Sequence, residues 1–145
     1  SQGRGREWLL LMGRSGLGKT HIAQSAAYAA ISRGLLCIFW VVSDLADAMR
    51  TAATSDDDQE AELARCGQAQ FLVLDDIGRE HVTEFWIAKL YRLLDIRTRH
   101  NMRTLVTTNH NLAELETIYG GSPLVSRMTQ GECLAMDGTD ARSSV

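Results

Sequence analysis

A glycine-rich segment near the N-terminus limits the possible folds of this 145-residue chain more than any other feature. Its residues are Gly13, Arg14, Ser15, Gly16, Leu17, Gly18, Lys19 and Thr20. The apolar run Trp8–Met12 precedes it, and apolar residues at helical spacing follow over residues 20–33. Closely spaced glycines let consecutive backbone N–H groups surround a phosphate at a helix N-terminus, where the helix dipole favours negative charge. The spacing Gly-x-x-x-x-Gly-Lys-Thr therefore predicts a P-loop that binds a nucleoside triphosphate, with a glycine-rich turn without a ligand as the alternative.

The polar side chains at the end of this segment have separate expected roles. Lys19 is expected to reach the β and γ phosphates, and the hydroxyl of Thr20 is expected to bind Mg²⁺. We expect further nucleotide contacts from residues 13–18 and from His21. The four histidines have no metal-ligand spacing, so surface or capping roles are the alternative for His21 and the expectation for His81, His100 and His110. The expected cofactors are ATP or ADP with Mg²⁺.

A second motif places two carboxylates directly after an apolar run. Residues 71–74 are apolar, and Asp75 and Asp76 follow them. Open α/β sheets bind ligands at the carboxyl ends of their strands, so this Walker B pattern predicts acids beside the nucleotide. Asp75 is expected to hold Mg²⁺ through water, and Asp76 to orient or deprotonate the attacking water. Aspartate is one methylene shorter than the glutamate of fast ATPases, so we expect slow hydrolysis; an acidic surface turn is the alternative.

Strands and helices are expected to alternate along the chain. Apolar runs predict strands at residues 8–12, 35–42, 71–74, 104–108 and 133–136. Helical spacing predicts helices at residues 20–33, 43–49 and 83–99, with Thr83 as an N-cap. Ser122 and Pro123 are expected as N-cap and first residue of a short helix through Arg127, and the acidic residues 55–60 as a solvated loop or helix start. The pattern predicts a three-layer α/β P-loop fold, with a parallel sheet flanked by helices and no separate lid domain.

Composition narrows the classes of partner. A formal net charge of −3 argues against nonspecific nucleic-acid binding by overall charge, so any DNA contact must be local. The densest basic stretch could contact DNA or could be a solvated helix end; its arginines are Arg92, Arg97, Arg99 and Arg103. The aromatic residues Trp40, Phe85 and Trp86 are expected to pack in the core rather than stack on bases.

The remaining composition indicates a soluble, cytoplasmic protein without membrane contact. No apolar run reaches the roughly 18 to 20 residues of a membrane span, and no signal-peptide pattern occurs at the N-terminus. The cysteines are odd in number and lack Cys-x-x-Cys spacing, so the sequence suggests neither a disulfide framework nor a zinc site. We therefore expect Cys37, Cys66 and Cys133 to be small buried residues.

Two polar residues remain ambiguous from spacing alone. Asn109 ends the strand at residues 104–108, so its amide could bind a γ phosphate or position a water, or could simply cap a turn. Arg127 follows Ser126 on the short helix and could be an arginine finger or a surface arginine.

The whole series of motifs resembles the DnaC/IstB-like AAA+ ATPases, and most closely the helicase loaders among them. The resemblance spans residues 8–142, and its more specific motifs are Asp75-Asp76-Ile77-Gly78, Ser126-Arg127-Met128 and Gly138-x-Asp140-x-Arg142. It implies that Asn109 is sensor 1, that Arg127 is a finger acting in the neighbouring subunit, and that Arg142 is sensor 2. Ala141 replaces the tyrosine common before that last arginine. The resemblance also implies that the sensor 1 strand lies between the P-loop and Walker B strands.

The expected domains are a linker edge of a longer protein at residues 1–7, an AAA+ core at residues 8–142 and a tail at residues 143–145. The resemblance implies an ATP-dependent loader that assembles a replicative hexameric helicase on single-stranded DNA. It would contact the helicase through an N-terminal segment outside this chain and form a homo-oligomer on ATP and DNA. The alternatives are an IstB-like transposition ATPase on duplex DNA and a nucleotide-sensing interaction module with little hydrolysis. A small-molecule kinase is disfavoured because no arginine-rich lid segment follows residues 71–76.

Overall fold

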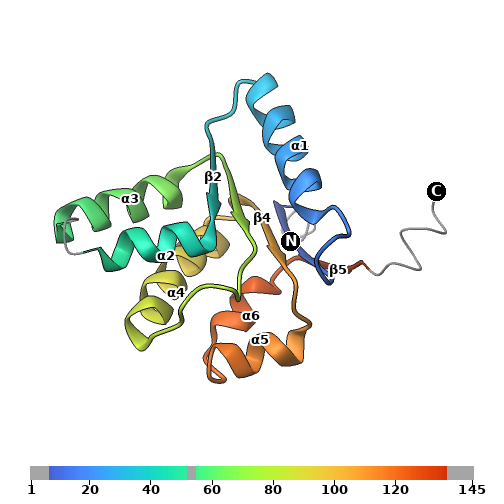
Figure 1. Cartoon of the computed structure of the whole chain (residues 1–145). Helices are drawn as coiled ribbons and strands as arrows, with labels where there is room; N and C mark the ends of the chain where they lie inside the picture. Colours follow the sequence, from blue (N-terminus) through green and yellow to red (C-terminus); the bar gives the residue numbers. More distant parts are fainter. Residues whose placement is uncertain (1–6, 52–54, 137–145) are drawn as a thin grey trace.

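The structure is a computed structural model that describes residues 7–51 and 55–136. Five strands and six helices follow one another along this part of the chain (Figure 1). The strands are β1 (Trp8–Met12), β2 (Cys37–Val41), β3 (Phe71–Asp75), β4 (Arg103–Thr108) and β5 (Glu132–Ala135). The helices are α1 (Lys19–Ser32), α2 (Val42–Arg50), α3 (Asp56–Gln68), α4 (Glu84–Arg99), α5 (Leu112–Ile118) and α6 (Leu124–Met128).

The strands form one parallel sheet in the order β2-β3-β4-β1-β5. Leu10 of β1 and Leu74 of β3 both pair with Val106 of β4, so the three strands lie in register at the centre of the sheet. The expected position of the sensor 1 strand, between the P-loop and Walker B strands, is confirmed. Parallel strands end at a common edge, so the residues that follow β1, β3 and β4 lie close together.

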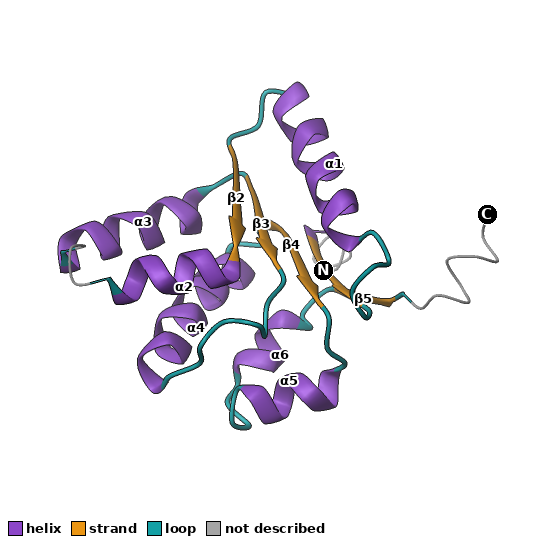
Figure 2. Ribbon diagram, viewed as in Figure 1, coloured by secondary structure: helices purple, strands orange, loops and turns teal. Residues whose placement is uncertain are grey.

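Helices cover both faces of the sheet, which confirms the three-layer fold (Figure 2). The larger core contains Leu10, Leu72 and Val106 from the sheet and joins them to buried side chains of α2 to α6. The smaller core on the opposite face contains Leu11, Val73 and Leu105, packed against Ala23 and Ala27 of α1. Among the described helices, α1 alone contributes to the smaller core. No helix in the same part of the chain has both the length and the apolar character to cross a membrane.

The helix starts follow from side-chain caps. Thr83 accepts a hydrogen bond from the Trp86 backbone N–H at 3.1 Å, which confirms the predicted N-cap of α4. Ser55 caps α3, and the first turn of this helix carries three aspartates. Their negative charges are stabilised by the positive end of the helix dipole. The sequence predicted at most a helix start there, because the acidic and polar residues of α3 leave little apolar pattern. The start of α6 was predicted one residue too early: Pro123 is the N-cap, and Ser122 Oγ accepts from Leu124 N at 3.4 Å.

Three expectations about burial are wrong. Phe85 points into solvent, with 48% of its surface exposed, because it lies on the outer side of the first turn of α4. Cys133 is exposed on β5 at the edge of the sheet, whereas Cys66 is buried. Arg97 is 0% exposed, so it belongs neither to a DNA-contacting surface nor to a solvated helix end.

The guanidinium of Arg97 joins three segments inside the core. Its Nη1 donates to the carbonyls of Cys66 at 2.8 Å and Ala69 at 2.9 Å, near the C-terminus of α3. Its Nε donates to Thr104 Oγ1 at 2.8 Å, and its Nη2 to the Arg103 carbonyl at 2.6 Å. Burial lowers the pKa of Arg97 to about 10, which keeps the side chain protonated at neutral pH. Arg97 is therefore a structural cation that joins α3 and α4 to β4.

Candidate nucleotide-binding site

The P-loop connects β1 to α1 at the carboxyl edge of the sheet. The Gly13 N–H donates to the Thr108 carbonyl at 3.1 Å, so the loop leaves the sheet beside the end of β4. Gly18 is the N-cap of α1 and has φ +86, a left-handed conformation that favours glycine. No side chain caps α1, which leaves its first N–H groups to be satisfied by other partners. Phosphate oxygens are suitable partners at such a helix N-terminus.

Lys19 is buried beneath the loop at the first position of α1. Its Nζ donates to the Arg14 carbonyl at 2.8 Å, which ties the two ends of the loop together. Burial lowers the pKa of the Lys19 ammonium, while the nearby carboxylates of Asp76 and Asp75 act in the opposite direction. The loop therefore holds a cation where two acids already face it.

Asp75 joins the end of β3 to the P-loop helix. The Thr20 hydroxyl donates to Asp75 Oδ2 at 3.0 Å, and the Thr107 hydroxyl donates to Asp75 Oδ1 at 2.6 Å. The carboxylate is buried, so its position is fixed by these two hydroxyl groups. No cluster of three or more His, Cys, Asp or Glu side chains suited to a metal ion occurs within residues 7–51 and 55–136. A hydroxyl and one carboxylate nevertheless fit Mg²⁺, which often takes few protein ligands and completes its shell with phosphates and water.

Asp76 lies at the mouth of the site in an uncommon backbone conformation. Its φ of +62 is left-handed, and its N–H is held by Thr107 Oγ1 at 2.8 Å. Asn109 Nδ2 donates to Asp76 Oδ1 at 3.3 Å, and Arg79 Nη1 lies 3.4 Å from Asp76 Oδ2. Asp76 and Asn109 come from neighbouring strands, as the sheet order requires, and their polar groups meet at one point.

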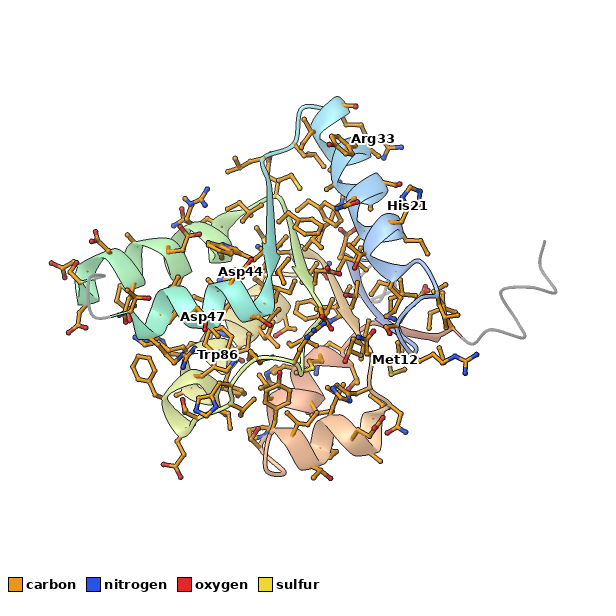
Figure 3. All side chains as sticks on the ribbon, viewed as in Figure 1. Met12, His21, Arg33, Asp44, Asp47 and Trp86 are labelled. Atoms are coloured by element: carbon orange, nitrogen blue, oxygen red, sulfur yellow. The ribbon has the colours of Figure 1, made fainter. Side chains whose placement is uncertain are left out.

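A cavity of about 240 Å³ opens between the P-loop and these polar residues. It is lined by Ser15, Gly16, Gly18, Lys19, Thr20, His21, Asp76, Arg79, Thr107 and Asn109. A second cavity of about 530 Å³ is lined by Gly13 and Arg14 and also touches Asn109. Leu17 lines neither of these two cavities. In Figure 3, Met12 at the end of β1 and His21 in the first turn of α1 mark the two ends of the loop.

Arg79 was not among the predicted site residues; its side chain is 74% exposed on the loop after β3. Arg79 brings a second cation, besides Lys19, to the 240 Å³ cavity. The sequence offered one signal for this position, a basic residue three positions after the Walker B residue Asp76.

Glu80, which was also not predicted, is a buried carboxylate that holds the loop after Asp76. Glu80 Oε1 accepts from the Gly78 N–H at 2.8 Å, and its Oε2 accepts from Trp86 Nε1 at 2.7 Å and the Tyr119 hydroxyl at 2.6 Å. Burial raises the pKa of Tyr119, and the Glu80 carboxylate raises it further. The Tyr119 hydroxyl therefore stays protonated and donates its hydrogen bond to Glu80. Gly78 has φ +99, and a Cβ there would come within 2.7 Å of His110, so this turn requires glycine. Glu80 thus connects the Asp76 loop to α4 and to the end of α5.

Arg127 is not among the residues that line the 240 Å³ cavity. It lies on α6, where its Nε donates to Asp95 Oδ1 at 3.0 Å and its Nη2 to the Tyr91 hydroxyl at 3.2 Å. The Asp95 hydrogen bond is the main reason that the pKa of Arg127 is raised. Arg142, the expected sensor 2 residue, lies outside the described residues.

The parallel sheet, with β4 between β1 and β3, and a P-loop facing two successive carboxylates define a P-loop domain of the AAA+ class. The solved structures agree. A crystal structure of the DnaC helicase loader has a TM-score of 0.75 and 25% sequence identity over 92% of this chain and 80% of that chain. Aquifex aeolicus DnaA bound to AMPPCP has a TM-score of 0.80 over 92% of this chain and 41% of that chain; at 22% identity it supports the fold alone.

The chain belongs to the family of IstB-like ATP binding proteins, because the model of that family matches residues 4–130. The replicative helicase loader DnaC of Escherichia coli K12 is 26% identical over 126 residues, which cover 86% of this chain and 51% of DnaC. An ATP-binding protein of the insertion sequence IS5376 from Geobacillus stearothermophilus is 29% identical over 127 residues, covering 85% of this chain and 48% of that protein. This chain therefore spans about half the length of the curated relatives that it matches.

Proposed function

We propose that this chain is the ATP-hydrolysing core of a helicase loader, which assembles a replicative hexameric helicase on single-stranded DNA. The observation that carries the ATPase proposal is the meeting of Lys19, Asp76 and Asn109 at one cavity. These side chains supply a cation, a carboxylate and a neutral amide where the end of a bound triphosphate would lie.

In this proposal the P-loop holds the phosphates. Lys19 exchanges its hydrogen bond to the Arg14 carbonyl for contacts with the β and γ phosphates. The Thr20 hydroxyl and the Asp75 carboxylate would hold Mg²⁺, Asp75 through water. When bound, the ion supplies positive charge to the β and γ phosphate oxygens.

Asp76 is proposed to orient the attacking water and accept its proton. Its Oδ1 contacts Asn109 and its Oδ2 contacts Arg79, so both oxygens have partners in this conformation. A water near the γ phosphate would take the place of one of these contacts. Asn109 then senses the γ phosphate through its amide without adding charge. The short Asp76 side chain supports the expectation of slow hydrolysis.

Arg127 is proposed to complete the ATP site of the neighbouring subunit in a homo-oligomer formed on ATP and DNA. An arginine finger stabilises the transition-state charge and can contribute several orders of magnitude to the rate. The test mixes two inactive variants under conditions where they co-assemble. Arg127→Ala keeps an intact P-loop, and Lys19→Ala keeps an intact finger, so ATP hydrolysis should reappear only in the mixture. A mixture as inactive as its parts would remove Arg127 from catalysis.

The similarity to DnaC in sequence and in solved structure supports the loader proposal. A transposition ATPase on duplex DNA is the second candidate, favoured by the IstB-like family match and by the similarity to insertion-sequence proteins. ATP turnover is measured with no DNA, with single-stranded DNA and with duplex DNA. Stimulation by single strands, together with transfer of the helicase onto them by the full-length protein, supports the loader. Stimulation by duplex DNA alone supports the transposition ATPase.

A nucleotide-sensing module with little hydrolysis is the third candidate. The contact between Arg79 and Asp76 favours it, because Arg79 occupies the carboxylate oxygen that would otherwise be open to an attacking water. Turnover that stays at background with either form of DNA, while ATP still drives assembly, would support this candidate.

In the loader proposal, Arg97 makes no contact with DNA because its side chain is buried. The exposed arginines of the basic stretch are each paired with a carboxylate: Arg92 with Glu60, Arg99 with Asp95, and Arg103 with Glu7. DNA phosphates would have to replace these carboxylates. Such contacts are expected to weaken steeply with salt.

A further inference from the structure

Arg127 is held at two points of its guanidinium by α4. The Nε donates to Asp95 Oδ1 at 3.0 Å, and the Nη2 donates to the Tyr91 hydroxyl at 3.2 Å. The guanidinium carbon also lies 5.5 Å from the centre of the Tyr91 ring, within the range of a cation–π contact. These contacts fix one edge of a planar group whose five N–H donors have a rigid geometry.

The opposite edge of the same guanidinium remains available. Within the described part of the chain, the structure records no hydrogen bond from Arg127 Nη1, and 30% of the side chain is exposed. The helix that carries Arg127 cannot shift freely, because Leu124, Val125 and Met128 of α6 are buried in the core. One edge of the guanidinium is therefore anchored, while its Nη1 is left for a further partner on a partly exposed side chain.

Asp95 binds a second arginine, Arg99, in addition to Arg127. Its Oδ2 accepts from Arg99 Nε at 3.1 Å, and the Arg99 side chain is 63% exposed. The Asp95 carboxylate thus binds two arginines through different oxygens. Only the Arg127 contact involves the proposed finger.

We infer that Asp95 is a positioning residue that holds the Arg127 guanidinium in place for the ATP site of a neighbouring subunit. Without this anchor, Arg127 would sample several rotamers, and its Nη1 edge would spend little time in the orientation that a γ phosphate requires. Misplacement of a catalytic group by about 1 Å can cost on the order of a hundredfold in rate. The inference rests on the proposed role of Arg127 in trans and adds the residue that orients it.

The competing explanation is that Asp95 and Arg127 only fasten α6 to α4. In that case, removing the carboxylate would lower stability but would not alter catalysis in a neighbouring, otherwise intact site. An isolated variant cannot separate the two explanations, because a loss of activity could come from either. The separation requires the change to be made in a subunit whose own ATP site is already inactive.

The experiment uses the mixture described above, with Arg127→Ala as the subunit that hydrolyses ATP and Lys19→Ala as the subunit that donates the finger. Three further finger donors combine Lys19→Ala with Asp95→Ala, Asp95→Asn or Arg65→Ala. Turnover is measured across ATP concentrations, and co-assembly is measured by analytical ultracentrifugation. We expect the Asp95→Ala donor to lower kcat of the mixture by tenfold to a hundredfold with KM unchanged, on the order of the misplacement cost. With the Asp95→Asn donor, kcat of the mixture should lie between the values for the parent donor and for the Asp95→Ala donor, since an amide keeps one acceptor but loses the charge.

The Arg65→Ala donor is the control, because it removes an exposed, ion-paired arginine of α3 outside the basic stretch, and it should support the same kcat as the parent donor. If Asp95→Ala prevents folding or co-assembly, the same comparison is made with Tyr91→Phe, which removes the hydroxyl acceptor and keeps the ring. A donor that lacks Asp95 or the Tyr91 hydroxyl, co-assembles normally and supports the parent kcat would overturn the inference while leaving the finger intact. An inactive mixture of the two parent variants would overturn the finger itself and this inference with it.

Discussion

The hydroxyl of Thr20 donates to Asp75 Oδ2 at 3.0 Å, although the two residues are 55 positions apart in the chain. This hydrogen bond joins the first turn of α1 to the end of β3, and the Thr107 hydroxyl holds the other oxygen of the same carboxylate. Both oxygens of the Asp75 carboxylate therefore accept a hydrogen bond from a threonine hydroxyl. The contact shows that the two motifs separated in sequence form one polar site at the carboxyl edge of the sheet.

Lys19→Ala should abolish ATP binding in the isolated chain. The substitution removes the buried ammonium that holds the Arg14 carbonyl, and with it a cation that faces both Asp75 and Asp76. The charge of the γ phosphate would then face those two acids with weaker compensation. Isothermal titration calorimetry with ATP checks this, with Arg33→Ala as a control that removes an exposed cation at the opposite end of α1. Parental affinity in Lys19→Ala would contradict the P-loop assignment.

Asp76→Asn should bind ATP normally and hydrolyse it poorly. The amide keeps the size of the side chain and can still contact Asn109, but it cannot accept a proton from water. Loss of a general base typically costs on the order of a hundredfold or more in rate. Phosphate release under saturating ATP measures the effect. Turnover equal to that of the parent protein would assign the base to another residue.

Glu80→Gln should lower both stability and turnover. The amide nitrogen cannot accept from Trp86 Nε1 or from the Tyr119 hydroxyl, so a buried donor would lose its partner at a cost of about 1–3 kcal/mol. The loop that carries Asp76 would lose an anchor as well. Urea unfolding followed by tryptophan fluorescence measures the first effect, and ATP turnover below the transition measures the second. The exposed Glu116→Gln on α5 is the control and should change neither.

Acid should weaken the contact between α3 and α4. Hydrogen bonds from Lys89 and Arg92 lower the pKa of Glu60 from 4.5 to about 2. Because the folded state depresses this pKa, the stabilisation is complete above pH 4.5 and disappears as the pH falls toward 2. Glu60 is 45% exposed, so solvent screening limits the effect to about 1 kcal/mol or less.

The difference in unfolding free energy between the parent protein and Glu60→Gln, measured from pH 6 to pH 2, tests this expectation. The difference should shrink as the pH falls. A difference that stays constant over this range would assign the change to packing rather than to charge.

The sequence predicts the sheet and the polar residues at its carboxyl edge well because both depend on local patterns. All five strands appear near their expected ranges, since apolar runs bounded by loops are distinctive. Asp76 and Asn109 meet because parallel strands end together, and their adjacency followed from the strand order that the family resemblance implied. Contacts between distant segments could not be predicted in this way. The pairing of Arg127 with Asp95 depends on how α6 packs across α4, which no spacing encodes.

The burial of Arg97 could be predicted only in part from the sequence. Arg97 follows Leu90 and Leu94 at helical spacing, so it continues the buried stripe of α4. Its charge nevertheless predicts a position at the protein surface, because arginine is rarely fully buried without a partner. The partners are backbone carbonyls at the end of α3 and the start of β4, which become visible only in the folded arrangement.

Arg97→Ala should destabilise the fold by about 3 kcal/mol, because each buried acceptor left without a donor costs about 1–3 kcal/mol and several share this guanidinium. Arg97→Lys should recover part of the loss, since an ammonium donates hydrogen bonds but cannot span the carbonyls of Cys66, Ala69 and Arg103 together. Urea unfolding midpoints check both variants. The exposed Arg99→Ala is the matched control on the same helix, with an expected change of about 1 kcal/mol or less. DNA binding separates the buried role from a surface role: at a temperature where Arg97→Ala is still folded, its salt dependence of single-stranded DNA binding should equal that of the parent. A flatter salt dependence in that variant would mean that Arg97 contacts phosphate and that the buried network does not describe its role.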